Sequence, residues 1–265
     1  MNIIVCVKQV PDPEAPSASF KIDAENKNVT AAGVPPVLDP YSEYALEAAL
    51  KLKDVDGNRI TAVSLGSGLV RDVIKKALAM GADELILLED EAFASGDSWS
   101  TAYALAAGIK KIGDYDLILC GRQAADWDAG QMGCGIAELL DLPAVTLARK
   151  IELSGDKLKV ERITDDGYEV IQTTLPAVVT ISNEIGEPRY PTIRGIMAAK
   201  KIEPTIWKPA DIGLEAAQVG ESGRKSIITK LAKPQREVEC RIIEGETPEE
   251  AGVNLALRLR QEKLI

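Results

Sequence analysis

Short, uninterrupted apolar runs alternate with segments of helical periodicity over the first 140 residues of the chain. An uninterrupted apolar run predicts a strand covered on both faces, and apolar residues at intervals of three and four predict an amphipathic helix. The predicted strands cover 3–7, 60–65, 84–88 and 117–120, and the predicted helices cover 70–80, 98–112 and 132–140. Strands that alternate with helices form right-handed crossovers, so we expect an α/β fold with a parallel sheet sandwiched by helices.

One further helix has a clear start signal. Asp39 is expected to cap its N-terminus and Pro40 to occupy its first position, and an apolar stripe follows. Gly81 is expected to end the helix over 70–80, and the segment 11–19, which is rich in Pro and Ser, is expected to be a loop.

The pattern changes after residue 144. Segments 145–153, 157–164 and 167–174 alternate polar and apolar positions, and 154–156 and 165–167 have the composition of hairpin turns. We therefore expect an antiparallel extension over about 145–175, after which the run 177–181 returns as an apolar strand.

The last part of the chain has little capacity to form a core. From residue 203 it is interrupted by prolines and charges, as in Lys233-Pro-Gln-Arg236, until a final helix near 248–261. We expect one α/β domain over 1–205 and a C-terminal arm over 206–265.

Composition excludes several classes of function. The net charge of −10 makes nonspecific attraction to nucleic acid or to an anionic membrane surface unfavourable. The N-terminus has no basic leader and only a short apolar run, so neither a signal peptide nor membrane insertion is expected and a cytoplasmic location follows. Without histidine, the chain lacks histidine-dependent catalysis and histidine metal sites.

The four cysteines do not form a metal or redox motif. Cys6, Cys120, Cys134 and Cys240 are scattered along the chain without a C-x-x-C pair. We expect each of them to be a small buried apolar residue.

The turns after the predicted strands are the candidate binding site. Open parallel sheets bind ligands outside the carboxyl ends of their strands. There, the turns 7–10, 39–42, 65–68 and 121–131 would lie together, and the helix N-termini behind the last two would favour an anion such as a nucleotide phosphate. Neither G-x-G-x-x-G nor a P-loop is present, and Gly66-Ser67-Gly68 is equally compatible with an ordinary strand-to-helix turn.

Asp126-Trp127-Asp128 in the long turn has more than one interpretation. Two carboxylates can hold Mg²⁺ beside a phosphate, but they more commonly cap the following helix, bind local N–H groups or face a ribose hydroxyl, which would leave Gln131 and main-chain donors to meet the phosphate. Trp127 can stack on a ring or cover the loop.

Five segments together resemble the small (beta) subunit of electron transfer flavoprotein, over nearly the whole chain and in the right order. These segments are Val5-Cys-Val-Lys-Gln-Val-Pro-Asp12, Asp39-Pro-Tyr-Ser-Glu-Tyr-Ala45, Ala77-Leu-Ala-Met-Gly-Ala-Asp83, Asp116-Leu-Ile-Leu-Cys-Gly-Arg-Gln-Ala124 and Glu187-Pro-Arg-Tyr-Pro-Thr-Ile-Arg-Gly-Ile-Met-Ala-Ala-Lys-Lys201. The resemblance implies an adenine nucleotide alpha hydrolase-like fold and an electron carrier rather than an enzyme. It also implies a heterodimer with a larger alpha subunit, which holds most of the electron-carrying FAD. The heterodimer would accept electrons from acyl-CoA dehydrogenases or related flavin dehydrogenases.

The resemblance also implies a nucleotide in the small subunit itself, either AMP or, in electron-bifurcating members, a second FAD. Carried over by position, the cofactor-binding residues are Cys6, Asp39, Pro40, Tyr41, Ser42, Leu65, Gly121, Arg122, Gln123, Ala124, Ala125, Asp126, Trp127, Asp128, Ala129, Gly130, Gln131 and Met132. The segment from Glu187 to Lys201 would dock on the dehydrogenase with Ile193 as its apolar anchor, and the C-terminal arm would wrap the alpha subunit. For this segment, a helix start with exposed basic residues is the alternative.

Two departures bear on the choice between AMP and a second FAD. Bifurcating members have Asp-Gly-Asp-Thr-Ala-Gln in the long turn, whereas this chain has Trp127 for the glycine and Ala129 for the threonine. AMP is therefore favoured, although 96–104 and the opening segment look more like the anaerobic and nitrogen-fixation-associated branches.

Two other classes are alternatives. A stand-alone adenine-nucleotide-binding stress or signalling protein of the same fold would need neither the arm nor the segment 187–201. An ATP-dependent ligase of the pyrophosphatase type would have Ser-Gly-Gly-x-Asp-Ser after a strand, and Ser64-Leu-Gly-Ser-Gly-Leu69 lacks it.

Overall fold

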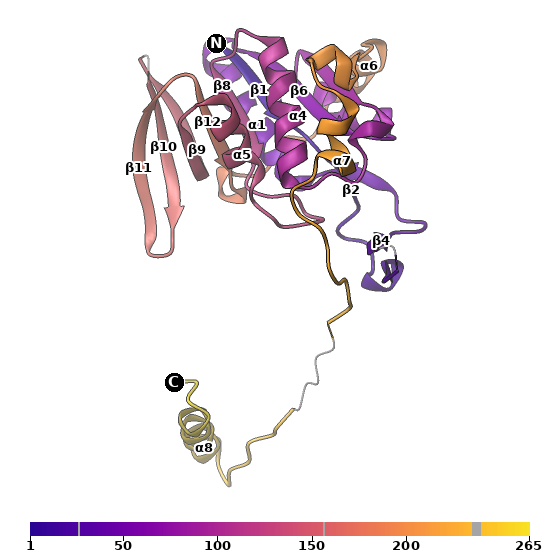
Figure 1. Ribbon diagram of the computed structural model, residues 1–265. Helices are drawn as coiled ribbons and strands as arrows, with labels where there is room; N and C mark the ends of the chain where they lie inside the picture. Colours follow the sequence, from indigo (N-terminus) through magenta and orange to yellow (C-terminus); the bar gives the residue numbers. More distant parts are fainter. Residues whose placement is uncertain (26, 156, 235–239) are drawn as a thin grey trace.

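A nine-stranded sheet forms the centre of the molecule (Figure 1). The computed structural model describes residues 1–25, 27–155, 157–234 and 240–265. The strand order is β11-β10-β9-β12-β8-β1-β6-β7-β13. Its parallel centre consists of β1 (Asn2–Cys6), β6 (Arg59–Gly66), β7 (Glu84–Glu89), β8 (Leu117–Gly121) and β12 (Ala177–Ile181). The parallel α/β fold expected from the alternating pattern is confirmed.

Helices cover both faces of this sheet. On one face, α1 (Pro40–Asp56) and α3 (Lys76–Met80) pack on strand residues such as Val5 and Leu119; on the other, α4 (Ser98–Ile112) and α5 (Met132–Leu140) pack on residues such as Ile4 and Ile118. Neighbouring strand residues therefore alternate between two separate cores, which requires the continuous apolar runs seen in the sequence.

The antiparallel extension is also present. β9 (Ala144–Ser154), β10 (Lys157–Thr164) and β11 (Gly167–Thr174) pair antiparallel, and β9 joins the parallel sheet beside β12. Of the first expected hairpin turn, Asp156 lies outside the described residues. Leu158 and Val160 on β10 are fully buried and extend the core under these strands.

Some local elements differ from the prediction. The helix expected over 70–80 is divided into α2 (Arg71–Ile74) and α3, and the division falls at Lys75. The segment after β1 contains β2 (Gln9–Pro11), which pairs with β5 (Pro36–Leu38) and overlaps the loop expected over 11–19 only at Pro11. A small hairpin of β3 (Lys21–Asp23) and β4 (Asn28–Thr30) follows. Three-residue strands are too short to have a recognisable hydrophobic period. The 3-10 helices are η1 (Ser17–Ser19), η2 (Glu91–Phe93), η3 (Asn183–Ile185), η4 (Pro209–Ile212) and η5 (Ala216–Gln218).

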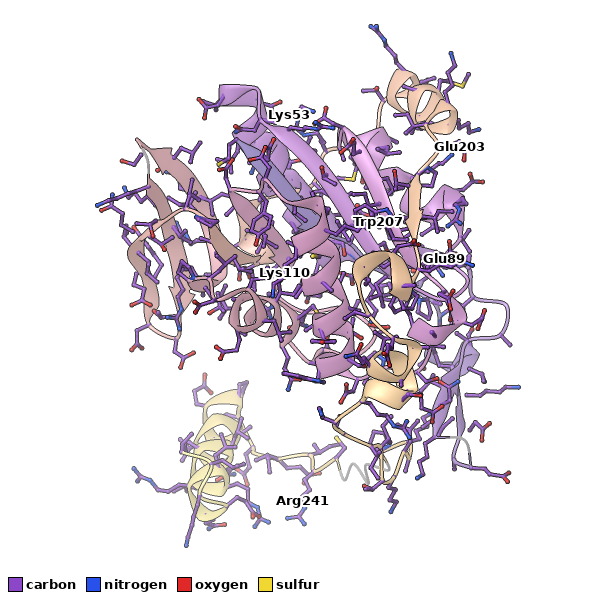
Figure 2. All side chains as sticks on the ribbon, turned by 45° about the horizontal axis from the view of Figure 1, so that its top comes forward. Lys53, Glu89, Lys110, Glu203, Trp207 and Arg241 are labelled. Carbon is purple, nitrogen blue, oxygen red and sulfur yellow. The ribbon has the colours of Figure 1, made fainter. Side chains whose placement is uncertain are left out.

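The body of the protein continues past residue 205, where the arm was expected to begin. β13 (Thr205–Trp207) pairs in parallel with β7 and completes the sheet edge. The Lys111 ammonium lies 5.0 Å from the centre of the Trp207 ring, which fixes this strand near α4. Trp207 itself is labelled in Figure 2. Ile212 and Val219 are buried in the second core. These apolar contacts are dispersed among prolines and charges, so the sequence pattern did not reveal them.

A carboxylate at the N-cap of α4 holds the chain where it follows α7 (Gly220–Gly223). Asp97 caps α4 by accepting a hydrogen bond from the Ser100 N–H at 2.9 Å, and its second oxygen accepts from the N–H groups of Lys225 and Ser226, both at 2.8 Å. Burial alone would raise the pKa of Asp97, but these hydrogen bonds outweigh it and lower that pKa. The chain therefore leaves the body just after α7 from a fixed point.

Beyond this point the chain extends away from the sheet and ends in α8 (Pro248–Gln261), which matches the predicted final helix (Figure 1). α8 has no buried residue. Of the segment Lys233–Arg236 considered in the sequence, Gln235 and Arg236 lie outside the described residues. Throughout the described ranges, every helix is too short or too polar to cross a membrane.

The cysteines only partly follow the expectation of burial. All four are free; Cys6 and Cys120 are buried, whereas Cys134 and Cys240 are exposed. Cys134 is on the outward side of the first turn of α5, and Cys240 is in the C-terminal segment, which has no core around it.

Candidate functional site

The carboxyl ends of the central strands meet the first turn of α1. β1 ends at Cys6, β6 at Gly66 and β8 at Gly121, so these residues share the edge of the sheet where ligands bind. A Cβ atom on Gly121 would come within 2.6 Å of the Tyr41 Cβ and 2.8 Å of the Tyr41 carbonyl carbon. Only glycine permits this approach. The start of α1 is thus held directly over the end of β8.

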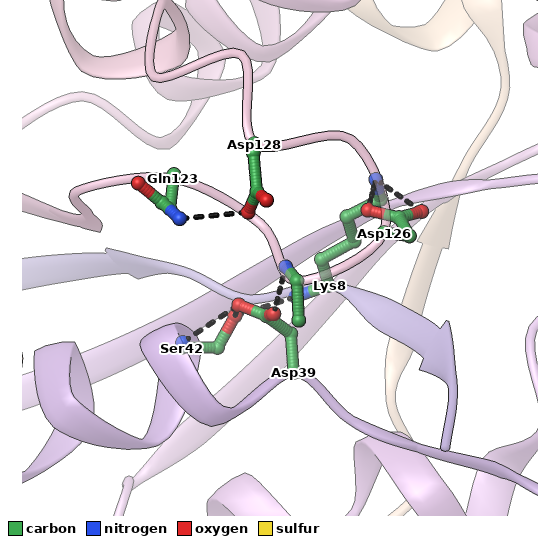
Figure 3. Close-up of polar contacts among 7 residues, drawn as sticks. Lys8, Asp39, Ser42, Gln123, Asp126 and Asp128 are labelled. Carbon is green, nitrogen blue, oxygen red and sulfur yellow. Dashed lines mark hydrogen bonds and ion pairs between the residues drawn. The ribbon is translucent and has the colours of Figure 1, made fainter. Parts of the chain in front are cut away.

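A buried carboxylate joins α1 to the long turn after β8 (Figure 3). Asp39 is 1 % exposed, and its Oδ2 accepts hydrogen bonds from the Ser42 N–H at 2.9 Å and the Ser42 hydroxyl at 3.1 Å. Its Oδ1 accepts from the Ala125 N–H at 2.8 Å. Burial raises the pKa of Asp39, and the hydrogen bonds from Ala125 and Ser42 oppose that rise. The predicted cap is confirmed, and the same side chain also holds the long turn.

A lysine connects the first strand to this turn. The Lys8 N–H donates to the Ser42 Oγ at 3.0 Å, and its ammonium lies 2.6 Å from one Asp126 oxygen and 2.8 Å from the other (Figure 3). Because the pair is largely exposed, its main role is to orient the turn rather than to contribute much stability.

The other half of the turn is held by polar contacts to α1. The Gln123 amide donates to Asp128 Oδ1 at 2.7 Å and to the Tyr41 hydroxyl at 3.2 Å. The Arg122 guanidinium lies 5.7 Å from the centre of the Tyr41 ring and donates to the Ser182 hydroxyl at 3.3 Å. The turn is thus preorganised at several points before any ligand binds.

The two carboxylates of the turn do not cap the following helix, so that part of the sequence interpretation is wrong. The N-cap of α5 is Gln131, and its side chain accepts no hydrogen bond from the first turn of the helix. Asp126 binds Lys8 and Asp128 binds Gln123 instead. Within the described ranges, there is no group of three acidic or cysteine side chains able to hold a metal ion. Trp127 is 63 % exposed, so it does not cover the loop.

The two expected anion-binding turns differ in their free amides. Behind Gly66-Ser67-Gly68, the Leu69 N–H donates to Glu89 at 3.1 Å and the Val70 N–H donates to Gln9 at 2.7 Å. The α2 helix there has only four residues, so the expectation of free amides at this turn is wrong. By contrast, α5 has nine residues, no side-chain cap and no acidic residue in its first turn, and Gly130 before it has a φ of +64°. The N-terminal amides of α5 therefore remain the candidate anion-binding site.

All the residues expected to bind a nucleotide lie at this edge of the sheet. They are Cys6 at the end of β1, residues 39–42 at the start of α1, Leu65 near the end of β6, and residues 121–132 between β8 and the first turn of α5. The sequence reasoning missed Lys8 and Ser182 as partners of the long turn. Lys8 follows an apolar strand and faces an acidic turn, and this charge pairing was the available signal.

A groove also lies away from the strand ends. A groove of about 830 Å³ lies between the C-terminal half of α1 and β9–β10, and residues lining it include Lys51, Val55, Arg149 and Lys150. We assign the site to the strand ends because uncapped amides and polar groups converge there, whereas the groove is an open surface between a helix and the extension.

The expected docking segment forms a separate surface. Its second half is α6 (Ile193–Lys201), which Thr192 caps by accepting a hydrogen bond from the Gly195 N–H at 3.0 Å. The side chains of Tyr190 and Ile193 are 93 % and 83 % exposed. The segment therefore combines a helix start with two exposed apolar side chains, Tyr190 and Ile193, which we call the apolar tip. No other described residue buries them.

The comparisons with known proteins agree with these features. Residues 27–212 match the family model described as the electron transfer flavoprotein domain. The chain is 40 % identical to the electron transfer flavoprotein subunit beta of Thermoanaerobacterium thermosaccharolyticum and 39 % identical to the caffeyl-CoA reductase-Etf complex subunit CarD of Acetobacterium woodii, in both cases over 100 % of both chains. It is also 36 % identical to protein FixA of Azorhizobium caulinodans, over 90 % of this chain and 86 % of that protein. The chain therefore belongs to the family of electron transfer flavoprotein beta subunits.

Proposed function

We propose that this chain is the small subunit of an electron transfer flavoprotein and binds an adenine nucleotide at the carboxyl edge of its sheet. The observation that carries the proposal is the uncapped start of α5, which follows a turn locked by Asp39 and Lys8. Free amides at a helix N-terminus favour the phosphate of a nucleotide even in a chain with a net charge of −10.

The nucleotide we favour is AMP, with a second FAD as the alternative. Its phosphate would lie on the amides of 130–132, and the residues expected from the sequence would enclose the remainder. Trp127 and Ala129 replace the glycine and threonine of the bifurcating pattern, and this difference favours AMP. The name of the caffeyl-CoA reductase-Etf complex subunit keeps the alternative open, because it places that relative in a complex with a CoA-ester reductase.

The flavin that carries electrons is proposed to lie mainly on a larger alpha subunit. FAD would supply the one- and two-electron chemistry, while this chain would orient the partner and exclude water from the shared surface. The exposed apolar residues of α8, Val253, Leu255 and Leu257, support this partnership because none of them has a core in this chain. We infer that the arm, starting after Ser226 rather than at 206, wraps this subunit and that the complex acts in the cytoplasm.

Cofactor stoichiometry tests the proposal. The chain should be co-expressed with the adjacent large-subunit gene, purified, denatured, and assayed for FAD and AMP per heterodimer. One FAD and one AMP are expected; two FAD and no AMP would support the bifurcating alternative. A homodimer that carries ATP and no flavin would contradict the proposal and support the stand-alone stress or signalling protein.

Replacement of the apolar tip should weaken electron transfer without loss of cofactor. Burial of an isoleucine on a partner is worth about 1.5–3 kcal/mol, so Ile193→Ala should raise the KM for the flavoprotein in reduction by an acyl-CoA dehydrogenase by roughly tenfold or more. Val55→Ala, at an equally exposed residue of α1, is the control and should leave KM unchanged. Loss of flavin in Ile193→Ala would instead mean that this residue supports the fold.

A further inference from the structure

A buried ion pair anchors the chain directly before the apolar tip of the docking segment. Glu47 lies in the middle of α1 and is only 4 % exposed, among alanine and leucine residues of the first core. A buried carboxylate is costly unless it is paired and hydrogen-bonded. Its partner comes from 142 positions further along the chain, at the start of the docking segment.

Arg189 satisfies both oxygens of this carboxylate. Its backbone N–H and its Nε donate to Glu47 Oε2 at 3.0 and 2.9 Å, and its Nη2 donates to Oε1 at 3.1 Å. The same Nη2 donates to Asp54 Oδ2 at 2.8 Å. These hydrogen bonds, first to Glu47 and then to Asp54, raise the pKa of Arg189, so the guanidinium is charged at every working pH. Because one contact is made by the backbone, the pair fixes the main chain as well as the side chain.

The residues around Arg189 restrict the segment further. Pro188 and Pro191 flank it in sequence, each with a fixed φ. A small cavity of about 180 Å³ beside it is lined by these residues together with the first turns of α1 and Lys76. On the other side of the tip, a Cβ on Gly195 would come within 2.5 Å of the Ala79 carbonyl oxygen, so α6 lies tightly against α3.

Both ends of the tip are thus anchored while its own side chains face solvent. Tyr190 follows Arg189 directly, and Ile193 begins α6. Rigid presentation of an apolar tip lowers the entropy that must be lost when a partner binds. This matters most in a carrier that must bind and release its donor in each cycle.

We propose that Arg189, through its bidentate pair with Glu47, is a positioning residue that presets the apolar tip for docking on the electron donor. This inference rests on the proposed function. Arg189 acts through Tyr190 and Ile193, so its replacement should affect the association with the donor and leave electron transfer within the complex, flavin content and nucleotide content unchanged.

The test uses the purified heterodimer, with an acyl-CoA dehydrogenase reduced by butyryl-CoA as donor. Arg189→Lys keeps the charge but loses the planar fork, and we expect a rise in KM of about fivefold to tenfold with kcat within about twofold. Arg59→Lys is the matched control, because Arg59 forms an exposed pair with Glu84 at the amino ends of β6 and β7. Asp54→Asn removes only the exposed partner of Arg189 and should change KM by less than about twofold.

A double variant separates a positioning role from an independent contact. If Arg189 acts through the tip, Arg189→Lys should add less than about twofold to the KM of Ile193→Ala, because the anchor contact that it positions is already gone. Fully additive effects, or an unchanged KM in Arg189→Lys while Ile193→Ala raises it, would overturn the inference. If the wild-type heterodimer accepts no electrons, the proposed function fails. Amide hydrogen exchange then tests the positioning role by itself, because unchanged exchange rates over residues 189–196 in Arg189→Lys would overturn it.

Discussion

Gly121→Ala should abolish nucleotide binding and lower the free energy of unfolding by about 3 kcal/mol, as forced overpacking of a tight core contact does. The new methyl group would lie 2.6 Å from the Tyr41 Cβ and 2.8 Å from the Tyr41 carbonyl carbon. The first turn of α1 would have to move away from β8, and Asp39 would move with it. Urea unfolding measures the stability, and AMP content after purification measures the site.

The control for this substitution is Gly252→Ala. Gly252 lies in α8, with open space where a Cβ would be placed, and alanine favours a helix more than glycine does. We expect no loss of stability and no change in AMP content. A Gly121→Ala protein that keeps both its AMP and its stability would contradict the close packing of α1 on the strand end.

Asp39→Ala should lower the free energy of unfolding by about 2–4 kcal/mol, from the loss of a helix cap and from buried N–H groups left without a partner. Ser42 loses the acceptor at the start of α1, and Ala125 loses the acceptor that holds the long turn. Because the turn and the cap share this carboxylate, AMP should be lost in the same variant. Asp39→Asn retains one acceptor oxygen, so its free energy of unfolding and its AMP content should lie between those of the wild type and Asp39→Ala.

Asp90→Ala is the matched control for this prediction. Asp90 caps the short 3-10 helix over 91–93 by accepting a local hydrogen bond from Ala92 at 3.0 Å, and among the described residues no hydrogen bond joins it to the candidate site. Its replacement should cost about 1 kcal/mol or less and leave the AMP content unchanged. Equal stability losses in the two variants would mean that Asp39 is only a helix cap.

Much of the fold was predictable because its signals are local and periodic. The strand over 3–7 is an uninterrupted apolar run and the helix over 98–112 is rich in alanine, and both are present with nearly the same bounds. The cap at Asp39 was predictable from its own residue type and the proline after it. By contrast, β13 and the buried Val219 lie in a segment of prolines and charges, and only the edge of β7 and the second core determine where they pack.

The location of the candidate site was predictable from the sequence, but the hydrogen bonds and ion pairs within it were not. The topology of a parallel sheet brings its strand ends together, so residues 39–42 and 121–132 were placed correctly near one another. The partners of their polar groups depend on contacts across more than 80 positions, such as Asp39 with Ala125 and Lys8 with Asp126. Helix capping was one of the roles expected for the acidic turn, but the lysine that pairs with Asp126 comes from the segment between β1 and β2.

Asp97 gives the C-terminal extension a fixed origin. Its carboxylate begins α4 and also holds the amides of Lys225 and Ser226, so the direction of departure is set by the rigid body of the protein. Insertions or deletions between Ser226 and α8 would therefore change the length of the chain that tethers α8 to this origin. The tether length in turn sets the local concentration of α8 at any surface within its reach.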